Sequence, residues 1–373
     1  MTPKIASFLD ASPATPCLVV DLDRVDANYE ALRAALPAAK IYYAVKANPA
    51  PQILTLLAAK GACFDAASLP EIEACLKAGA PASAISFGNT VKKATAIAAA
   101  YKYGVPLYAF DSIEELEKIA HRAPGAKVYC RIAVANEGAD WPLTKKFGTT
   151  VERARELMLA APGLGLVPHG LSFHVGSQQT ATPAYELAIA KVAMLFTDLK
   201  ASGLELKMLN LGGGLPVNYR EDVPGLEIFG DAIMDTLIAH FGNDLPEILI
   251  EPGRAVVGNA GVVASEVVLV CRRMAADERR WVYLDIGRFG GLAETEGEAI
   301  RYRITAGNGA TGPVALAGPS CDGVDIMYEK TPYQLPLDLQ AGDRVLIHDT
   351  GAYVTTYASR NFNGFAPLEE HYL

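Results

Sequence analysis

The sequence predicts an α/β protein in which a closed (β/α)8 barrel is followed by a smaller all-β domain. Between residues 40 and 251, eight apolar, β-rich runs alternate with helix-like segments. The runs are continuously apolar, which is typical of parallel strands covered by helices. Eight such repeats favour a closed barrel of the TIM type over an open doubly wound sheet. From about residue 261, short strand-like runs separated by Gly, Pro and Asp indicate the all-β domain.

The predicted elements follow one another regularly along the chain. The eight barrel strands are predicted at 41–45, 62–64, 84–87, 106–110, 127–134, 170–175, 207–211 and 247–250. Helical periodicity between them predicts helices at 51–60, 71–77, 95–101, 113–120, 151–160, 185–199 and 231–240. The strands of the all-β domain are predicted at 262–270, 281–286, 300–305, 314–317 and 344–348.

An opening strand at 17–22 precedes the barrel and is expected to pair with the all-β domain, joining it to the start of the chain. We therefore expect the barrel domain to comprise residues 27–260. The β-sandwich or β-barrel domain would then be formed by residues 1–26 together with 261–373.

The composition excludes several functional classes. The chain has a net charge of −9 and no basic stripe with interleaved aromatics, so nucleic acid is not an expected partner. No apolar stretch is long enough to span a membrane, and residues 1–10 lack the pattern of a signal peptide. The six cysteines have no zinc-binding spacing, so no metal site is expected. These features predict a soluble, reduced, cytoplasmic protein.

Polar residues follow the predicted barrel strands at the ends where barrel enzymes keep their active sites. They are Lys46, Asp65, Arg131, His174, Gly212 to Gly214, and Glu251. Each is weak evidence alone, because strand ends commonly carry polar residues. Their shared placement predicts that they converge on one site.

Lys46 closes the apolar run YAVKAN at residues 43–48. A lysine in a sheltered site can lose its proton and form a Schiff base with an aldehyde cofactor. A surface lysine at a strand end is the alternative interpretation. Position alone does not decide between them.

The three consecutive glycines at 212–214 allow backbone N–H groups to approach an anion such as a phosphate. A tight turn is the alternative. Glu251 begins the sequence Glu-Pro-Gly-Arg, in which the carboxylate suits a protonated ring nitrogen and Arg254 suits a phosphate. An ion pair between Glu251 and Arg254 is equally compatible with those four residues.

The remaining candidates also have structural alternatives. His174 could stack on a flat aromatic ring or be a hydrogen-bonded core residue. Ser68 and Glu71 match a capping box, which explains Glu71 but leaves Asp65 unexplained. Cys321 lies in a Gly/Pro-rich loop of the all-β domain, where a β-turn with an incidental thiol is the simpler interpretation.

Several motifs together resemble one family, the pyridoxal 5′-phosphate-dependent decarboxylases with an alanine-racemase-like barrel, and most closely the ornithine decarboxylases. The motifs are YAVKAN at 43–48, FDAAS at 64–68, FHVGS at 173–177, GGG at 212–214, EPGR at 251–254, CDG at 321–323 and GAY at 351–353. They span most of the chain. The resemblance implies a barrel with a β-domain, and a homodimer whose active sites lie at the subunit interface.

The resemblance also implies roles for individual residues. The catalytic residues would be Lys46, which holds the cofactor covalently, His174, which stacks on its ring, Glu251, which pairs with its ring nitrogen, and Cys321. The other cofactor-binding residues would be Asp65, Arg131, Ser177, Gly213, Gly214, Gly253, Arg254 and Tyr353. The substrate-binding residues would be Asp285, Asp322, Tyr353 and Phe362.

Cys321 and Asp322 would enter the active site from the partner subunit. Diaminopimelate decarboxylases carry Cys-Glu at that point, whereas an aspartate suits a substrate with a distal ammonium. The chain departs from the eukaryotic pattern in its tail, 358–364, which is one residue longer, and in the pocket segment 287–290. Pocket length separates ornithine from lysine.

The expected activity is decarboxylation of L-ornithine to putrescine, a step of polyamine biosynthesis. A dual-specificity enzyme that also converts lysine to cadaverine is the first alternative. An alanine-racemase-like enzyme is less compatible with the Cys321 loop. A non-catalytic regulatory homologue would be expected to lack Lys46, Glu251 or Cys321, and all three are present.

Overall fold

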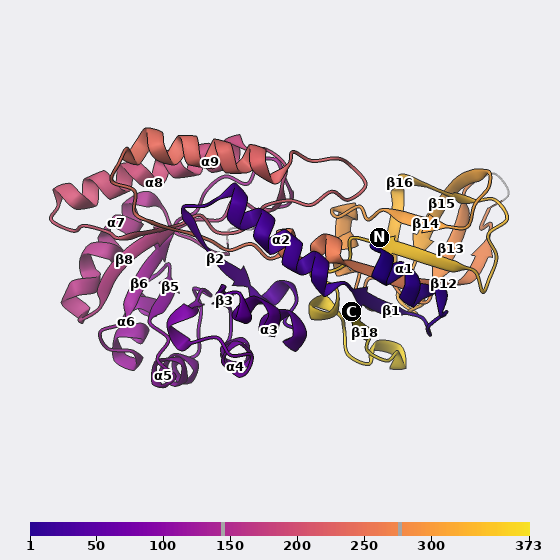
Figure 1. The fold of residues 1–373 in the computed structure, drawn as a ribbon, viewed down its shortest axis with the longest axis horizontal. Coiled ribbons are helices and arrows are strands. Elements are labelled where there is room, and N and C mark those ends of the chain that lie inside the picture. The colour runs from indigo at the N-terminus through magenta and orange to yellow at the C-terminus, as the bar shows by residue number, and fades with distance from the viewer. Residues whose placement is uncertain (143–145, 275–277) are drawn as a thin grey trace. The chain divides into compact units, whose positions relative to one another are not determined.

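The computed structural model describes residues 1–142, 146–274 and 278–373 (Figure 1). The chain divides into two compact units. The barrel unit comprises Asn28–Pro216 and Val223–Gly253, and the β unit comprises Met1–Ala27, Val217–Asp222 and Arg254–Leu373. Residues 27, 217–222 and 254–260, which the sequence interpretation assigned to the barrel domain, group with the β unit in the structure.

The barrel unit contains a closed barrel of eight parallel strands, as predicted. In chain order these strands are β2 (Ala39–Ala44), β3 (Cys63–Ala66), β4 (Ile85–Phe87), β5 (Leu107–Phe110), β6 (Lys127–Arg131), β8 (Val167–Ser172), β10 (Met208–Asn210) and β11 (Glu247–Ile250). Strand β11 pairs with β2 and closes the barrel. Because the strands are parallel, their carboxyl ends lie at the same rim.

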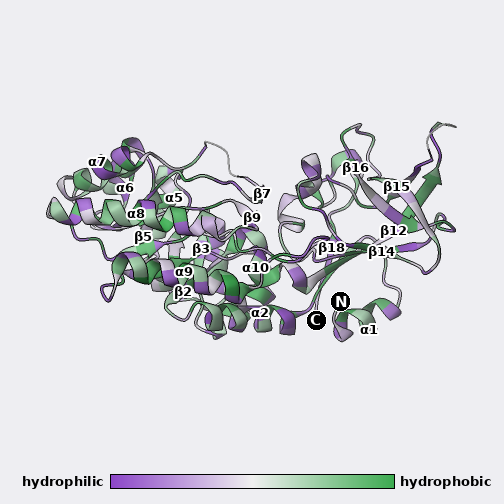
Figure 2. Ribbon diagram, turned by 90° about the horizontal axis from the view of Figure 1, so that it is seen from above, coloured by the Kyte–Doolittle hydropathy of each residue, from purple (hydrophilic) through white to green (hydrophobic). Residues whose placement is uncertain are grey.

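Helices cover the barrel strands (Figure 1). They are α2 (Leu22–Ala35), α3 (Pro51–Ala59), α4 (Leu69–Lys77), α5 (Ala94–Lys102), α6 (Ile113–Arg122), α7 (Val151–Ala160), α8 (Pro183–Ala201) and α9 (Leu226–Phe241). Three begin at side-chain caps, where Ser68, Ser112 and Thr150 accept the N–H three residues on. The helices carry both hydrophobic and hydrophilic bands (Figure 2), as expected when only one face packs against strands. Helix α2 was absent from the prediction.

The β unit contains an eight-stranded sheet. Its strands are β1 (Cys17–Val20), β12 (Gly261–Cys271), β13 (Arg280–Leu284), β14 (Ile304–Ala306), β15 (Thr311–Ala317), β16 (Ile326–Pro336), β17 (Arg344–His348) and β18 (Glu369–Tyr372). The sequence prediction missed β16 and β18, and it placed a strand at 300–305 where only the end is extended.

The opening strand β1 lies between two strands from much later in the chain. It pairs antiparallel with β12, with Cys17 opposite Ala264, and parallel with β18. It ends at Val20 because α2 begins at Leu22. Helix α1 (Pro3–Asp10), which was not predicted, packs Ile5 and Leu9 against β1 and β12.

The remaining elements are short. Strands β7 (Ala139–Trp141) and β9 (Ser177–Gln179) form a separate antiparallel ribbon. Short helical turns are α10 (Arg254–Val257), η1 (Val45–Ala47), η2 (Ala82–Ala84), η3 (Ala161–Leu164), η4 (Gly258–Ala260), η5 (Ala293–Glu298), η6 (Thr355–Tyr357) and η7 (Phe362–Gly364). Of the helices within the described residues, none has the length and apolar character needed to cross a membrane.

Candidate active site

Lys46 lies in the turn η1, directly after the first barrel strand. Its neighbours Val45 and Ala47 are buried, whereas Lys46 itself is exposed. The last residue of β2, Ala44, donates its N–H to the carbonyl of Pro252 at 3.0 Å. The backbone before Lys46 is therefore fixed to the segment that carries Glu251.

Asp65 lies on β3 and is buried, with 5% of its surface exposed. Burial raises the pKa of this carboxyl well above its ordinary value, and Glu251 and Glu71 raise it further, while Lys46 and Arg131 act in the opposite direction. These charged residues from five different segments thus share one electrostatic environment. The sequence predicted that four of them converge, and the structure adds Glu71.

The surroundings of Asp65 explain how a carboxyl is accommodated there. A Cβ at Gly88 would overlap its Oδ1 atom, so the chain leaves room for the carboxyl at that position. Within the described residues, Oδ1 of Asp65 has no hydrogen-bond partner. A buried acceptor of this kind is available to a ligand.

Glu71 differs from the predicted capping box in one detail. Its N–H donates to Ser68 Oγ at 3.4 Å, as predicted, but its carboxylate accepts the N–H of Ala67 at 2.6 Å. Burial is the main cause of a raised pKa for Glu71, and Lys46 opposes the shift. Glu71 therefore caps α4 and also contributes charge to the site.

Arg131 is the last residue of β6, and its guanidinium lies over the ring of Phe147 at 5.2 Å from the centroid. A flat cation held on an aromatic ring is restricted in orientation. Arg131 is thus held at the rim of the barrel.

His174 lies in a loop, not between strand residues as predicted, because β8 ends at Ser172. Its Nδ1 accepts the N–H of Gly176 at 3.1 Å. Burial lowers its pKa well below the ordinary value, and the positive charges of Arg131 and Lys46 add to this effect. The imidazole is therefore neutral with its proton on Nε2, a flat uncharged ring suited to stacking.

The backbone of the three glycines after β10 lies close to the backbone of the loops that follow β8 and β11. Gly212 and Gly214 have φ angles of +67° and +116°. A Cβ would lie 2.2 Å from the carbonyl oxygen of Phe173 at Gly212, 2.5 Å from that of Glu251 at Gly213, and 2.4 Å from that of Gly176 at Gly214. Only glycine fits at each position.

Asn210, the last residue of β10, was not among the predicted site residues. Its Oδ1 accepts the N–H of Gly212 at 2.9 Å, and its Nδ2 donates to Glu251 Oε1 at 2.5 Å. The N–H of Glu251 in turn donates to the carbonyl of Gly212 at 2.7 Å. A polar residue ending an apolar strand was the only sequence signal for this role.

Tyr129 was also missed. It lies on β6, and its hydroxyl is 3.0 Å from Ser86 Oγ on β4. Burial, followed by Glu251 and Asp65, raises the pKa of this phenol well above its ordinary value, so it is uncharged. Alone in the sequence, it could not be told from an ordinary core tyrosine.

Two predicted residues follow site residues along the chain. Ser177, three positions after His174, is the first residue of β9, and Gly253, two positions after Glu251, is buried. Their predicted contacts with the cofactor remain predictions.

Arg254 begins α10 in the β unit. Its guanidinium forms an ion pair with a residue that the sequence did not indicate. Its Nη1 and Nη2 atoms donate to Glu294 at 2.9 and 2.6 Å, and Nη1 also donates to the hydroxyl of Tyr219. The guanidinium lies over the Tyr353 ring at 5.0 Å. The ion pair observed for Arg254 is thus with Glu294, and its phosphate-binding role remains a prediction.

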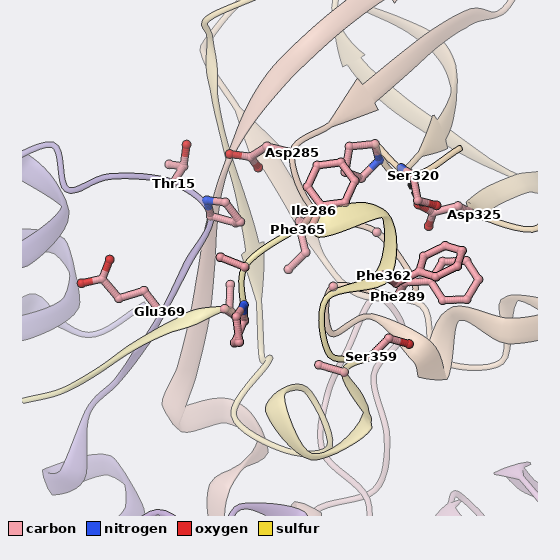
Figure 3. Close-up of a pocket in the computed structure, with 18 residues that line it drawn as sticks. Thr15, Asp285, Ile286, Phe289, Ser320, Asp325, Ser359, Phe362, Phe365 and Glu369 are labelled. Atoms are coloured by element: carbon pink, nitrogen blue, oxygen red, sulfur yellow. Dashed lines mark hydrogen bonds between the residues drawn. The ribbon is translucent and has the colours of Figure 1, made fainter. Parts of the chain in front are cut away.

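The β unit contains a pocket of about 240 Å³ (Figure 3). Asp285 lines it, and its Oδ1 accepts from Ser265 Oγ at 2.6 Å and from the N–H of Glu266 at 3.0 Å. Phe362 packs on Phe289 with ring centroids 4.4 Å apart, and both line the same pocket. The two segments that depart from the eukaryotic pattern, the tail and the pocket segment, therefore meet.

The Cys321 loop is held by its neighbours, although Cys321 itself is exposed. The N–H of Cys321 donates to Asn363 Oδ1 at 2.7 Å, and Asp322 Oδ1 accepts the N–H of Val324 at 3.0 Å. Buried Asp325 anchors the loop by accepting from the N–H and hydroxyl of Ser320. The loop is an ordered turn that presents a thiol and a carboxylate.

The residues of the barrel unit fit a phosphorylated pyridine aldehyde. They supply an exposed amine, a carboxylate oriented by an amide, a neutral flat imidazole and a backbone cradle in which no Cβ is tolerated. Such a cradle is a common phosphate-binding arrangement.

Comparison with known proteins shows the family. Residues 22–258 match the model of the family described as pyridoxal-dependent decarboxylase, pyridoxal binding domain. The chain belongs to the pyridoxal-dependent decarboxylases. Its cofactor is pyridoxal 5′-phosphate. The family and the cofactor expected from the motifs are therefore confirmed.

Three similar proteins illustrate the range of this decarboxylase's relatives. The lysine/ornithine decarboxylase of Selenomonas ruminantium is 39% identical over 94% of this chain and 88% of the relative. A lysine/ornithine decarboxylase from Vibrio vulnificus, solved with putrescine, is 31% identical with a TM-score of 0.89 over 99% of this chain and 97% of that chain. Antizyme inhibitor 2 of Xenopus laevis is 33% identical over 95% of this chain and 80% of the relative.

Proposed function

We propose that this decarboxylase, which acts on a basic amino acid, converts L-ornithine to putrescine and carbon dioxide. The observation that carries the proposal is the acidic character of the predicted substrate residues. Asp285 lines the pocket of the β unit, and Asp322 is presented by the Cys321 loop. Carboxylates suit the distal ammonium of a diamino acid, and each charge-assisted hydrogen bond contributes about 1.5–3 kcal/mol.

The chain's own residues have distinct tasks in this reaction. Pyridoxal phosphate supplies an electron sink that accepts the electron pair released when the carboxylate leaves. Lys46 would hold the cofactor covalently, and Glu251 would face the ring nitrogen and favour its protonated form. The neutral His174 would stack on the cofactor ring. Cys321 delivers a proton to the substrate carbon, which gives an amine as the product.

A second candidate, dual use of ornithine and lysine, is supported by the two relatives named lysine/ornithine decarboxylase. The substrates differ by one methylene, which a pocket discriminates by only about 1–3 kcal/mol. The pocket lined by Phe289 and Phe362 is where the chain departs from the eukaryotic pattern.

We also propose a homodimer with shared active sites. Cys321 and Asp322 are exposed on the β unit, where they are available to a second subunit. A regulatory homologue remains an alternative, because one relative is named for inhibition of antizyme. The presence of Lys46, Glu251 and Cys321 favours catalysis.

Carbon dioxide release from ornithine, lysine, arginine and meso-diaminopimelate, measured side by side on the cofactor-loaded protein, tests the proposal. We expect ornithine to give the highest kcat/KM, and the kcat/KM for lysine to be lower by no more than about 200-fold. Preference for meso-diaminopimelate would contradict the assignment of the distal ammonium to Asp285 and Asp322. Release from none of the four would favour the regulatory alternative.

A further inference from the structure

Asn210 connects the two parts of the barrel rim that are expected to hold opposite ends of the cofactor. One side of its amide faces the N–H of Gly212, and the other faces the carboxylate of Glu251. Asn210 is 1% exposed, so neither contact is shared with bulk solvent. Asn210 therefore contacts both Glu251 and the glycine turn.

The orientation of the amide follows from its partners. A backbone N–H can only donate, so the atom of Asn210 facing Gly212 must be the oxygen. The NH2 group therefore faces Glu251, whose Oε1 must accept. A second bond, from the Glu251 N–H to the carbonyl of Gly212, closes the arrangement. The amide, the turn and the carboxylate thus form one hydrogen-bonded unit.

Asp65 is a second carboxyl near this unit, and it is buried. Burial and then the charge of Glu251 raise the pKa of Asp65 well above its ordinary value. Glu251 accepts an amide N–H from Asn210, whereas Oδ1 of Asp65 has no hydrogen-bond partner within the described residues. The amide contact therefore distinguishes the two carboxyls.

We propose that Asn210 is a positioning residue that fixes the Glu251 carboxylate as an acceptor and locks it to the Gly212 turn. The inference rests on the proposed function for the role of Glu251, but the hydrogen-bonded unit exists in the protein without its cofactor. Asn210 acts through Glu251 and Gly212 and requires no contact with the substrate.

The isosteric variant Asn210→Asp separates the two contacts. Its side chain still offers an oxygen to the Gly212 N–H, but it opposes Glu251 with a second carboxylate. We expect the affinity for pyridoxal phosphate to fall about 10- to 100-fold, because a hydrogen bond to a charged group is lost. The visible absorbance of the lysine-bound cofactor should fall with it. The control Asn243→Asp makes the same substitution on an exposed loop of the barrel unit and should leave both unchanged.

The double variant Asn210→Asp/Glu251→Gln restores a donor and an acceptor with reversed direction. We expect the cofactor-free Asn210→Asp protein to melt about 3–6 °C below the wild type, and the double variant to recover most of that loss. Because Glu251→Gln alone also breaks the contact, its melting temperature completes the cycle. This readout uses neither cofactor nor substrate, so it stands even if the proposed activity fails.

Two results would overturn the proposal. The first is wild-type cofactor affinity in Asn210→Asp. The second is additivity of the two substitutions, in which the double variant melts at the temperature predicted from the sum of the single losses. If Asn210→Asp does not fold, a folded double variant supports the coupling, and an unfolded double variant contradicts it.

Discussion

Lys46 is an exposed side chain between two buried neighbours, on a turn fixed through Ala44 to the segment carrying Glu251. This placement gives its amine a defined position without enclosing it. The positive charge of Lys46 acts on Asp65 and His174, which places it among the residues of the site.

Lys46→Ala should abolish the visible absorbance of the bound cofactor, because the amine that forms the covalent link is missing. Turnover should fall by at least about 10³-fold. A matched control is Lys93→Ala, which removes an exposed lysine of the barrel unit and should retain both. An absorbance band that persists in Lys46→Ala would show that a different lysine carries the cofactor.

Some residues of the site could be predicted from the sequence, and others could not. Lys46, Asp65 and Glu251 could be predicted because strand ends of a parallel barrel meet at one rim. Asn210 and Glu294 could not, since each acts through a hydrogen bond to a residue 41 or 40 positions away. Such pairings depend on which elements the fold places side by side, and the sequence alone does not display them.

At the scale of elements, the barrel strands were the most predictable part of the chain. Most contain a short run of buried apolar residues, because both faces of a parallel strand are covered. Strand β16 was missed because its sequence, IMYEKTPYQLP, combines charged residues with two prolines. Strand β18 reads Glu-Glu-His-Tyr and has no apolar run at all.

His348, at the end of β17, couples the stability of the β unit to pH. Its Nε2 lies 2.8 Å from Thr305 Oγ on β14. Burial, with help from Arg303, lowers its pKa to about 4 from an ordinary value of 6.5. As the pH falls below about 6.5, the unfolded chain takes up the proton first, so stability is lost progressively toward pH 4.

We expect the wild type to lose about 1 kcal/mol more unfolding free energy than His348→Gln when the pH is lowered from about 7.5 to 5, a value reduced to allow for partial solvent screening. Glutamine keeps a polar contact to Thr305 but does not titrate. Urea unfolding of both proteins at the two pH values measures the difference. Parallel losses in the two proteins would show that His348 does not control the effect.

At the scale of the whole molecule, the residues assigned to catalysis and substrate binding are divided between two units. The barrel unit carries Lys46, His174 and Glu251, and the β unit carries Cys321 and Asp322. If the proposed homodimer shares its sites, a barrel unit of one subunit works with the β unit of its partner.

Mixing Lys46→Ala with Cys321→Ala subunits tests this arrangement. Each variant alone should be strongly impaired, and mixed dimers should recover up to about a quarter of wild-type activity, because half of the dimers are mixed and each has one intact site. Differently tagged subunits allow the mixed dimer to be isolated. A purified mixed dimer without recovered activity would indicate self-contained subunits.

Strand β1 has a consequence for how the protein is made. Its neighbours β12 and β18 lie more than 240 and 340 positions later in the sequence, so the ribosome completes β1 long before either of them. The whole barrel can close while β1 still lacks partners. During synthesis the apolar segment Cys17-Leu18-Val19-Val20 therefore stays unpaired. An unpaired apolar strand of this kind is a binding site for chaperones that shield nascent hydrophobic chains.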